Sequence, residues 1–523
     1  MYGYRGEFPP EHFNMARYCL ETGATRPADK TGLVVIKNAH DPKDTETWTY
    51  GALEDAVLRI AAALHADGLE PGDRLVIRLA NTSDYALLFF GAIAAGLLPL
   101  PASSALSAHE INFFLKDSGA RAIALTPDLP VGEIPCGITV YTPADVERLR
   151  IHKTRADYQD TLADDPAFLV YTSGTTARPK GVLQAQRSAW GRRPMYDGWY
   201  GLTPQDRVLH AGAFNWTYTL GTGLTDPWAN GATALVYTGA KDPAIWLPLM
   251  AAHEATIFAA VPTLYRQILK YGDLDDGMPT SFRHGLTAGE TLPPELAQEW
   301  QEQTGTILYE ALGQSEMSTY ISSSPSVPPK PGAIGKPQPD REVAILPTEG
   351  SNAPLSPGQK GLIAVHRSDP GLMLGYWNRP NEETLVMRGE WFCGGDMGVM
   401  DEEGYITHLG RDDDLMNAFG FRVSPLEVEQ VLMTHPDVAE VGVTEIQVRE
   451  NVSVIGAFVV MHEDTAADKE ALHALAEEKL ADYKLPREYI FTDALPRTPN
   501  GKVKRGELRR SHTPKLAPDT HAS

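Results

Sequence analysis

The sequence contains few cysteines, and they follow no pattern. Only three of its 523 residues are cysteine, at Cys19, Cys136 and Cys393. An odd number of widely spaced cysteines gives neither a disulfide framework nor a metal-binding pair, and it is typical of a reducing compartment. A chain of this length can bury several hydrophobic cores, so it needs no such cross-links to fold.

Positive charge is scarce as well. The chain has 46 Lys and Arg residues against 68 Asp and Glu, a formal net charge of −22. This balance excludes a nucleic-acid-binding protein, which needs a broad basic surface. It would also repel a phosphate-rich ligand, so local lysines, arginines and backbone N–H groups would have to attract one.

Long hydrophobic runs are absent. The most apolar stretch, residues 86–101, is interrupted by Gly91, Gly96 and Pro99 and is too short for a membrane span, so we expect a buried helix that runs into a short strand. The first ten residues contain no apolar segment of the signal-peptide type. The sequence therefore predicts a cytoplasmic protein without a membrane span.

Short strand-like runs alternate with helical patterns over most of the chain. Residues 54–66 place apolar side chains at helical spacing, and the next apolar run, residues 74–79, follows a Pro-Gly-Asp turn. Further apolar runs of the buried-strand type occur at residues 33–36, 122–125, 168–171 and 234–237. Such alternation predicts a layered α/β fold.

The pattern changes after about residue 410. A charged stretch is followed by two apolar runs and by a helical segment at about 469–482, which together are enough for a small α+β domain. We predict a large α/β N-terminal domain over residues 1–412, built from subdomains with parallel-type sheets. A small, mobile α+β C-terminal domain is expected over residues 413–523.

Residues 171–182 contain the most informative segment, Tyr-Thr-Ser-Gly-Thr-Thr-Ala-Arg-Pro-Lys-Gly-Val. Small side chains let the backbone approach a polyphosphate, hydroxyl and N–H groups can donate to it, and Arg178 and Lys180 add charge. The segment lacks the Gly-Lys-Ser/Thr of a Walker A loop. Its composition alone is equally compatible with a Ser/Thr-rich surface loop.

The order of residues, however, resembles the signature loop of the adenylate-forming superfamily, which includes acyl- and aryl-CoA synthetases, adenylation domains of peptide synthetases, and luciferases. The family pattern is Tyr-Thr-Ser-Gly-Thr-Thr-Gly-x-Pro-Lys-Gly. Ala177 stands at its seventh position, which is usually Gly. The resemblance implies that ATP is bound by Thr172, Ser173, Gly174, Thr175, Thr176 and Lys180.

Companion segments follow in the family's order. Residues 287–293, with Gly289 and Glu290, resemble the segment that packs on adenine. Residues 312–316, Leu-Gly-Gln-Ser-Glu, resemble the family's Gly-x-Thr-Glu segment, which assigns nucleotide contacts to Gly313, Gln314 and Ser315. A carboxylate beside a triphosphate needs a bridging cation, so the resemblance implies Mg²⁺ held by Glu316, with Thr172.

The segment at residues 391–398, Trp-Phe-Cys-Gly-Gly-Asp-Met-Gly, resembles the family's ribose-binding Thr-Gly-Asp segment, although an Asp in an ordinary turn would also fit. Asp396 is the residue that would accept hydrogen bonds from the ribose hydroxyls. Gly394 replaces the usual Thr, which leaves the role of that Thr unfilled.

Residues 410–429 resemble the family hinge, about which a small domain swings between two orientations. The resemblance assigns the hinge to Asp413, a ribose contact to Arg411 and a phosphate contact to Arg422. Phe419 and Gly420 would line the pantetheine tunnel of coenzyme A, where Gly allows close backbone approach.

The last companion segment, residues 495–505, resembles the terminal motif of the family, whose lysine is the catalytic cation; here that lysine is Lys502. With it, the resemblance extends over about residues 30–510.

The resemblance implies an ATP-dependent carboxylate–CoA ligase that converts an acid, ATP and CoA to acyl-CoA, AMP and diphosphate through an acyl-adenylate. No carrier-protein domain follows the last motif, which favours free CoA. The alternatives are a stand-alone adenylating enzyme that loads a carrier protein, a luciferase-type oxygenase, and a non-catalytic nucleotide-binding protein on the same fold. The oligomeric state stays open, a homodimer included.

Two features of the sequence restrict the class of carboxylic acid that the enzyme would activate. Residues 211–218 contain Asn215 and Trp216 but no Asp to pair with an amino acid's ammonium group. Acetate-specific relatives close the pocket with a Trp where this chain has Gly313, preceded by Leu312. We therefore predict a small-molecule medium-chain, branched or aromatic acid in a pocket that Trp216, Leu312 and Gly313 line. Trp216 either caps this pocket or packs in the core.

Overall fold

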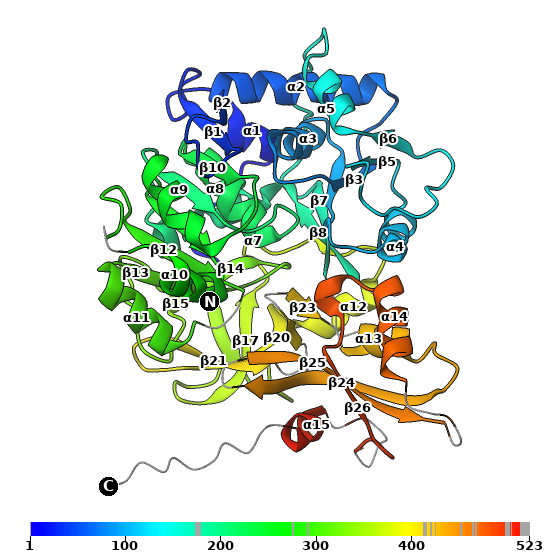
Figure 1. Cartoon of the computed structure of the whole chain (residues 1–523). Helices are drawn as coiled ribbons and strands as arrows, with labels where there is room; N and C mark the ends of the chain where they lie inside the picture. Colours follow the sequence, from blue (N-terminus) through cyan, green and yellow to red (C-terminus); the bar gives the residue numbers. More distant parts are fainter. Residues whose placement is uncertain are drawn as a thin grey trace.

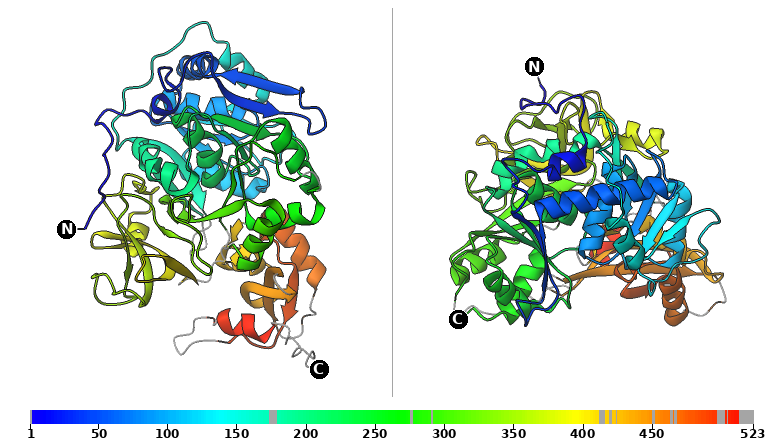
Figure 2. Two further views of the ribbon diagram at one scale, coloured as in Figure 1. Left: turned by 90° about the vertical axis from the view of Figure 1, so that its left-hand side faces the viewer. Right: turned by 90° about the horizontal axis from the view of Figure 1, so that it is seen from above.

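The computed structural model consists of a large α/β domain and a small α+β domain on one side of it (Figures 1 and 2). This is the predicted fold class. The structure describes residues 2–172, 179–274, 277–289, 292–411, 416–418, 421–423, 425–449, 452–462, 465, 468–496, 503 and 505–512. None of the helices in these ranges combines the length and the apolar character needed to cross a bilayer.

The large domain contains a nine-stranded sheet with the order β15-β14-β13-β12-β11-β9-β10-β1-β2, parallel from β13 to β1 and antiparallel at both edges. Its strands are β1 (Thr31–Ile36), β2 (Thr45–Thr49), β9 (Arg207–His210), β10 (Thr233–Tyr237), β11 (Ile257–Ala260), β12 (His284–Ala288), β13 (Ile307–Gln314), β14 (Ser318–Ser322) and β15 (Lys336–Pro337). The helices α9 (Trp246–Ala252), α10 (Pro262–Tyr271) and α11 (Pro294–Thr304) pack their buried faces on it.

A second, fully parallel sheet has the order β4-β3-β5-β6. It comprises β3 (Arg74–Arg78), β4 (Leu98–Pro101), β5 (Ala122–Leu125) and β6 (Thr139–Tyr141). The helices α2 (Tyr50–Ala66) and α3 (Ser83–Ala94) share one hydrophobic core with strands of both sheets. Every residue of α3 except Asp84 is buried, and β4 follows it, which confirms the expected buried helix and short strand.

Two further helices of this domain begin with the same hydrogen-bonded device. In α4 (Ala108–Ser118), Ser107 and Glu110 form a reciprocal capping box. In α5 (Pro143–Arg150), Thr142 and Asp145 form another. Each box satisfies backbone N–H groups that a helix start leaves without partners.

Two smaller sheets complete the large domain. A three-stranded sheet joins β7 (Pro166–Thr172), β8 (Lys180–Ala185) and β18 (Gly375–Tyr376). A five-stranded sheet joins β16 (Val343–Leu346), β17 (Lys360–His366), β19 (Met387–Arg388), β20 (Trp391–Met400) and β21 (Ile406–Arg411). The short helix α12 (Pro380–Val386) lies between β18 and β19 in the chain.

The small domain has its own core. Its sheet pairs β24 (Val438–Arg449) antiparallel with β25 (Val452–Met461), and β25 parallel with β26 (Glu488–Phe491). The hairpin β22 (Met416–Ala418) and β23 (Phe421–Val423) precedes it, with helices α13 (Pro425–Leu432), α14 (Lys469–Lys479) and α15 (Arg505–Ser511). A buried ion pair between Arg505 and Glu429, 2.7 Å long, ties α15 to α13.

Candidate active site

The predicted phosphate loop connects the paired antiparallel strands β7 and β8. Thr172 ends β7 and Lys180 begins β8, and the two residues face each other in the antiparallel register. This geometry differs from the strand–loop–helix arrangement of a Walker A site. Ser173, Gly174, Thr175 and Thr176 lie outside the described residues.

Lys180 is held at the base of this loop. It is 7% exposed, and its Nζ lies 2.5 Å from Oε2 of Glu382 in α12. The same Nζ lies 5.2 Å from the centre of the Tyr376 ring, within cation–π range. A phosphate that binds Lys180 would therefore compete with Glu382 for one ammonium group.

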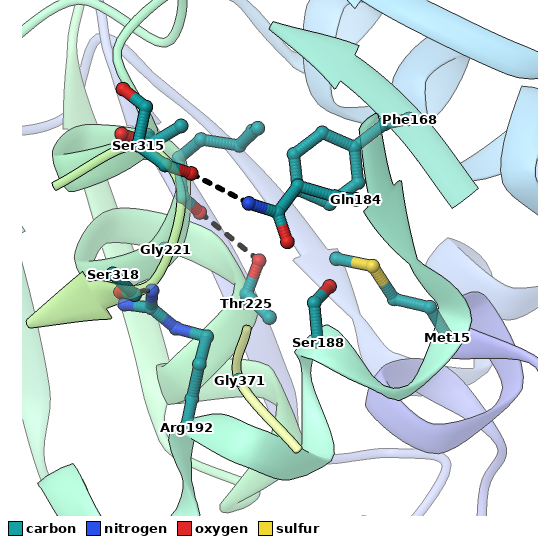
Figure 3. Close-up of a pocket in the computed structure, with 12 residues that line it drawn as sticks. Met15, Phe168, Gln184, Ser188, Arg192, Gly221, Thr225, Ser315, Ser318 and Gly371 are labelled. Atoms are coloured by element: carbon teal, nitrogen blue, oxygen red, sulfur yellow. Dashed lines mark hydrogen bonds between the residues drawn. The ribbon is translucent and has the colours of Figure 1, made fainter. Parts of the chain in front are cut away.

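Glu316 contacts the hydroxyl group of the same tyrosine, Tyr376. The Tyr376 hydroxyl donates to Oε1 of Glu316 over 2.8 Å. The turn that carries Glu316 is fixed by its backbone, because Met373 N donates to the Glu316 carbonyl and Gln184 donates to the Ser315 carbonyl over 2.6 Å (Figure 3). One tyrosine thus brings the predicted phosphate cation and the predicted metal ligand together.

A small cavity of about 30 Å³ lies beneath this turn (Figure 3). Gln184, Ser315 and Ser318 are among the residues that line it, beside the buried ion pair of Arg192 and Asp226. The volume accommodates about two water molecules, not an acyl group. Ser315 therefore lines this small cavity inside the domain.

Asp396 is completely buried and held on both sides. The Gln314 amide donates to its Oδ2, and His408 Nε2 lies 3.1 Å from its Oδ1. His408 comes from β21, which pairs antiparallel with β20, the strand that carries Asp396. These contacts fix the carboxylate within the strand β20, not in a turn.

The departure at Gly394 has a steric reason. A Cβ atom at this position would overlap the amide of Gln314, the group that donates to Asp396. The Gln314 side chain therefore occupies the space in which the family usually places its Thr side chain. Gly394 and Gln314 are a matched pair.

We expect Gly394→Thr to raise the KM for ATP by about tenfold. The displaced Gln314 amide would lose its hydrogen bond to the Asp396 carboxylate, and a bond to a charged group contributes about 1.5–3 kcal/mol. The double variant Gly394→Thr/Gln314→Ala relieves the overlap, so its KM should not exceed that of Gln314→Ala alone. Initial-rate measurements at varied ATP check this; additive effects of the two changes would contradict the steric pairing.

Trp216 lies between the adenine segment and the small domain. Its Cζ3 is 4.0 Å from the position of a Cβ at Gly289, which has φ +90°, and its ring meets Phe421 of β23 edge-on at 4.9 Å. The side chain is half-buried and belongs to none of the described hydrophobic cores. The sequence left open whether Trp216 caps the acyl pocket or packs in the core. This environment disfavours ordinary core packing.

Packing within the β13–β14 hairpin largely explains why Leu312 and Gly313 occupy their positions. Leu312 packs in a buried cluster with Met317 and Ile321. A Cβ at Gly313 would stand 2.7 Å from the Ser318 carbonyl oxygen in β14. The glycine is required by this close approach, whatever the size of the acyl pocket.

Sequence reasoning missed His210, at the end of β9. Its Nδ1 accepts a hydrogen bond from Gly212 N over 2.9 Å, and its ring packs edge-on against Tyr218 at 4.5 Å. Burial, together with Lys241, lowers the pKa of His210 to about 3. His210 is therefore neutral near pH 7 and shapes the 211–218 segment instead of exchanging protons.

The remaining predicted residues have no described side-chain geometry. Glu290, Asp413, Phe419, Gly420 and Lys502 lie outside the described residues. Arg411 ends β21 opposite Asp396, and Arg422 lies in β23 opposite Asn417, but only their backbones are described.

The donor set fits Mg²⁺. Among the residues that the structure describes, no three or more His, Cys, Asp or Glu side chains are grouped to hold a metal ion. Mg²⁺ in nucleotide sites is bound through one or two protein carboxylates and the substrate phosphates. A single carboxylate at Glu316, beside the base of the phosphate loop, meets that requirement.

Family models match both domains. The model for AMP-binding enzymes matches residues 20–377, and the model for the C-terminal domain of AMP-binding enzymes matches residues 427–502. The chain belongs to the AMP-binding enzyme family. This confirms the resemblance to adenylate-forming enzymes.

Curated relatives of this AMP-binding enzyme are CoA ligases. The 3-hydroxybenzoate–CoA ligase of Aromatoleum sp. (strain CIB) is 30% identical over 480 residues, 88% of this chain and 91% of the relative. The human mitochondrial acyl-coenzyme A synthetase ACSM5 is 31% identical over 538 residues, 96% of this chain and 90% of the relative.

Solved structures of the family superpose to different extents. A double mutant of o-succinylbenzoate CoA synthetase (MenE) from Bacillus subtilis, bound with its product analogue OSB-NCoA, gives a TM-score of 0.82 at 28% identity and covers 96% of this chain and 99% of that one. The anthranilate CoA ligase AuaEII in complex with anthranoyl-AMP gives 0.69 at 26% identity and covers 97% and 98%.

Proposed function

We propose that this enzyme joins an aromatic or medium-chain carboxylic acid to coenzyme A, with conversion of ATP to AMP and diphosphate. The observation that carries the proposal is the meeting of Lys180 and Glu316 on Tyr376. Lys180 would bind phosphate and Glu316 would bind the metal, and both side chains contact Tyr376 beside the end of the predicted phosphate loop.

In the first half-reaction a carboxylate oxygen of the acid attacks the α-phosphorus of ATP. A new P–O bond forms, the bond to the β-phosphate bridging oxygen breaks, and diphosphate leaves with both bonding electrons. Two anions meet, so catalysis depends on positioning and on neutralising charge. Lys502 would bridge the carboxylate and the α-phosphate, while Thr172, Lys180 and residues 173–176 would hold the diphosphate.

Mg²⁺ held by Glu316 and the substrate phosphates, with Thr172, would neutralise charge on the phosphates. Asp396, fixed by Gln314 and His408, would accept hydrogen bonds from the ribose hydroxyls. Arg411 would contact the ribose and Arg422 a phosphate. Gly289, Glu290 and Gly313 would surround the adenine.

In the second half-reaction the thiol sulfur of coenzyme A attacks the acyl carbonyl carbon. A C–S bond forms, the C–O bond to AMP breaks, and the thiol proton is released. Residues 413–523 would rotate about Asp413 against residues 1–412 between the two steps, so that Phe419 and Gly420 line the pantetheine path. Such a hinge motion can limit turnover.

The acyl group is inferred from the relatives and from the site. The names of two relatives specify 3-hydroxybenzoate and acyl substrates. Trp216, half-buried beside Gly289, offers a flat apolar surface at the mouth of the site. An aromatic or medium-chain acid is therefore favoured over acetate and over an amino acid.

Diphosphate release with a panel of acids tests the function. Benzoate, 3-hydroxybenzoate, octanoate, acetate and phenylalanine are compared, each with and without coenzyme A. We expect benzoate-type or octanoate substrates to give diphosphate and, with CoA, the acyl-CoA. Acid-dependent release that needs a carrier-protein thiol would favour the stand-alone adenylating enzyme, and no acid-dependent release would refute the proposal.

A further inference from the structure

The small domain is joined to the large one by a buried ionic contact at α4. Lys484, in the 3₁₀ turn after α14, places its Nζ 2.5 Å from Oε1 of Glu110 in α4 and 2.8 Å from Oε1 of Glu427 in α13. The side chains of Lys484, Glu110 and Glu427 are 5%, 6% and 10% exposed. One ammonium group therefore links a carboxylate of each domain in a site from which water is largely excluded.

This contact depends on all its charges. Burial alone would lower the pKa of Lys484, but the carboxylates of Glu427 and Glu110, together with Tyr483, raise it above its usual value, so the side chain is charged. Removing one partner of a buried ion pair leaves an uncompensated charge, which is strongly unfavourable. Loss of the charge on Glu110 or on Lys484 would therefore weaken the contact between the two domains at this point.

A second contact crosses the same boundary at the acyl site. Trp216 meets Phe421 edge-on at 4.9 Å, and Phe421 stacks on Tyr483 at 3.9 Å with an angle of 18° between the rings. Tyr483 directly precedes Lys484. The three rings connect the 211–218 segment of the large domain to the residue beside the ionic contact, so both contacts form or break together.

The comparisons indicate which domain arrangement this is. The structures bound with a product analogue and with an acyl-AMP have similar identity and coverage, but their TM-scores are 0.82 and 0.69. A rotation of the small domain, about a fifth of the chain, would give a difference of this kind. By this measure the structure resembles the product-analogue complex more closely than the acyl-AMP complex.

We propose that the Glu110–Lys484 contact latches the small domain in the orientation that serves thioester formation, which makes both residues positioning residues for the second half-reaction. The inference rests on the proposed function. It assigns no contact with substrate to either residue. A ruptured latch should slow acyl transfer to coenzyme A and leave acyl-adenylate formation untouched.

Glu110→Gln is the variant that isolates the latch. The amide can still accept the hydrogen bonds from Ser107 that begin α4, because Gln also serves in a capping box. It loses the charge that faces Lys484. Asp145→Asn changes the corresponding capping box of α5 and is the matched control. Within the described part of the chain, this box forms no hydrogen bond with the small domain.

The two half-reactions are measured separately: acid-dependent ATP–diphosphate exchange, and acyl-CoA formation from supplied acyl-adenylate. For Glu110→Gln we expect acyl-CoA formation to fall about 10- to 100-fold while exchange changes less than about twofold. Lys484→Met should behave alike, and the double variant Glu110→Gln/Lys484→Met should be no slower than the slower single variant. Equal loss of both half-reactions, no loss, or the same loss in Asp145→Asn would overturn the latch.

The domain orientation is measured without any activity. Cys136 is exposed, and Val452 in β25 is 46% exposed, so a Val452→Cys variant spin-labelled at both positions reports the distance between the domains. Glu110→Gln should add a second distance population; identical distributions with and without Glu110→Gln would refute the latch. A wild-type protein that exchanges diphosphate with no acid would instead refute the proposed function, whatever the distances.

Discussion

Replacement of Lys502 by alanine should lower acid-dependent ATP–diphosphate exchange by about 10²- to 10³-fold, the usual effect of removing one group that stabilises transition-state charge. The carboxylate of the acid and the α-phosphate of ATP are both anions, and Lys502 is the cation assigned between them. Acyl-CoA formation from supplied acyl-adenylate should stay within a few-fold of the wild-type rate. In that step AMP is the leaving group, and no second anion has to approach phosphorus.

Lys504→Ala is the control for this experiment. Lys504 lies two residues further along and carries the same charge, but no family role falls on it. Its loss should change neither half-reaction by more than about twofold, since a residue to which no contact with the reacting groups is assigned contributes little to the stabilisation of the transition state. Near-normal exchange in Lys502→Ala, or an equal loss in Lys504→Ala, would show that the catalytic cation has been assigned to the wrong residue.

Local sequence patterns predicted those structural features that depend on residues close together in the chain. The apolar residues of α3 leave no polar face, so burial was foreseeable from composition alone. The Ser, Thr and Gly run after β7 led to the prediction of a phosphate loop, because such a loop needs small residues in succession; this prediction falls on residues 173–178, outside the described part of the chain. The change of pattern near residue 410 also matches the point where the strands of a second, smaller core begin.

Long-range contacts explain what the sequence could not predict. His408 reaches Asp396 only because β21 pairs with β20, and Gln314 reaches it from a strand of a different sheet. In the sequence, the replacement of the family's Thr by Gly394 left the role of that Thr unfilled. In the structure, the space of the missing Thr side chain is filled from 80 residues away in the chain.

The pairing of Lys180 with Glu382 has the same origin. Glu382 lies in the first turn of α12, the helix that follows β18, and nothing in its sequence surroundings connects it with the predicted phosphate loop. Its carboxylate compensates the charge of the buried Lys180 ammonium group. If Lys180 binds phosphate as predicted, the phosphate would replace this carboxylate, and the attraction for phosphate would be local despite the net charge of −22.

Glu316→Gln should lower diphosphate exchange by about 10- to 100-fold and raise the Mg²⁺ concentration needed for half-maximal activity. The amide keeps the shape of the side chain and can still accept the hydrogen bond from Tyr376. Its lost charge leaves the substrate phosphates as the main anionic ligands of the metal. Exchange measured across a Mg²⁺ titration, at saturating ATP and acid, gives both quantities.

Tyr376→Phe separates the charge of Glu316 from its positioning. This variant keeps the ring beside Lys180 and removes only the hydroxyl that donates to Glu316. The loss of one hydrogen bond should lower exchange by no more than about tenfold, with little change in the Mg²⁺ requirement. If Glu316→Gln kept the wild-type Mg²⁺ dependence, or if Tyr376→Phe shifted it equally, Glu316 would be a structural partner of Tyr376 and the metal ligand would have to lie elsewhere.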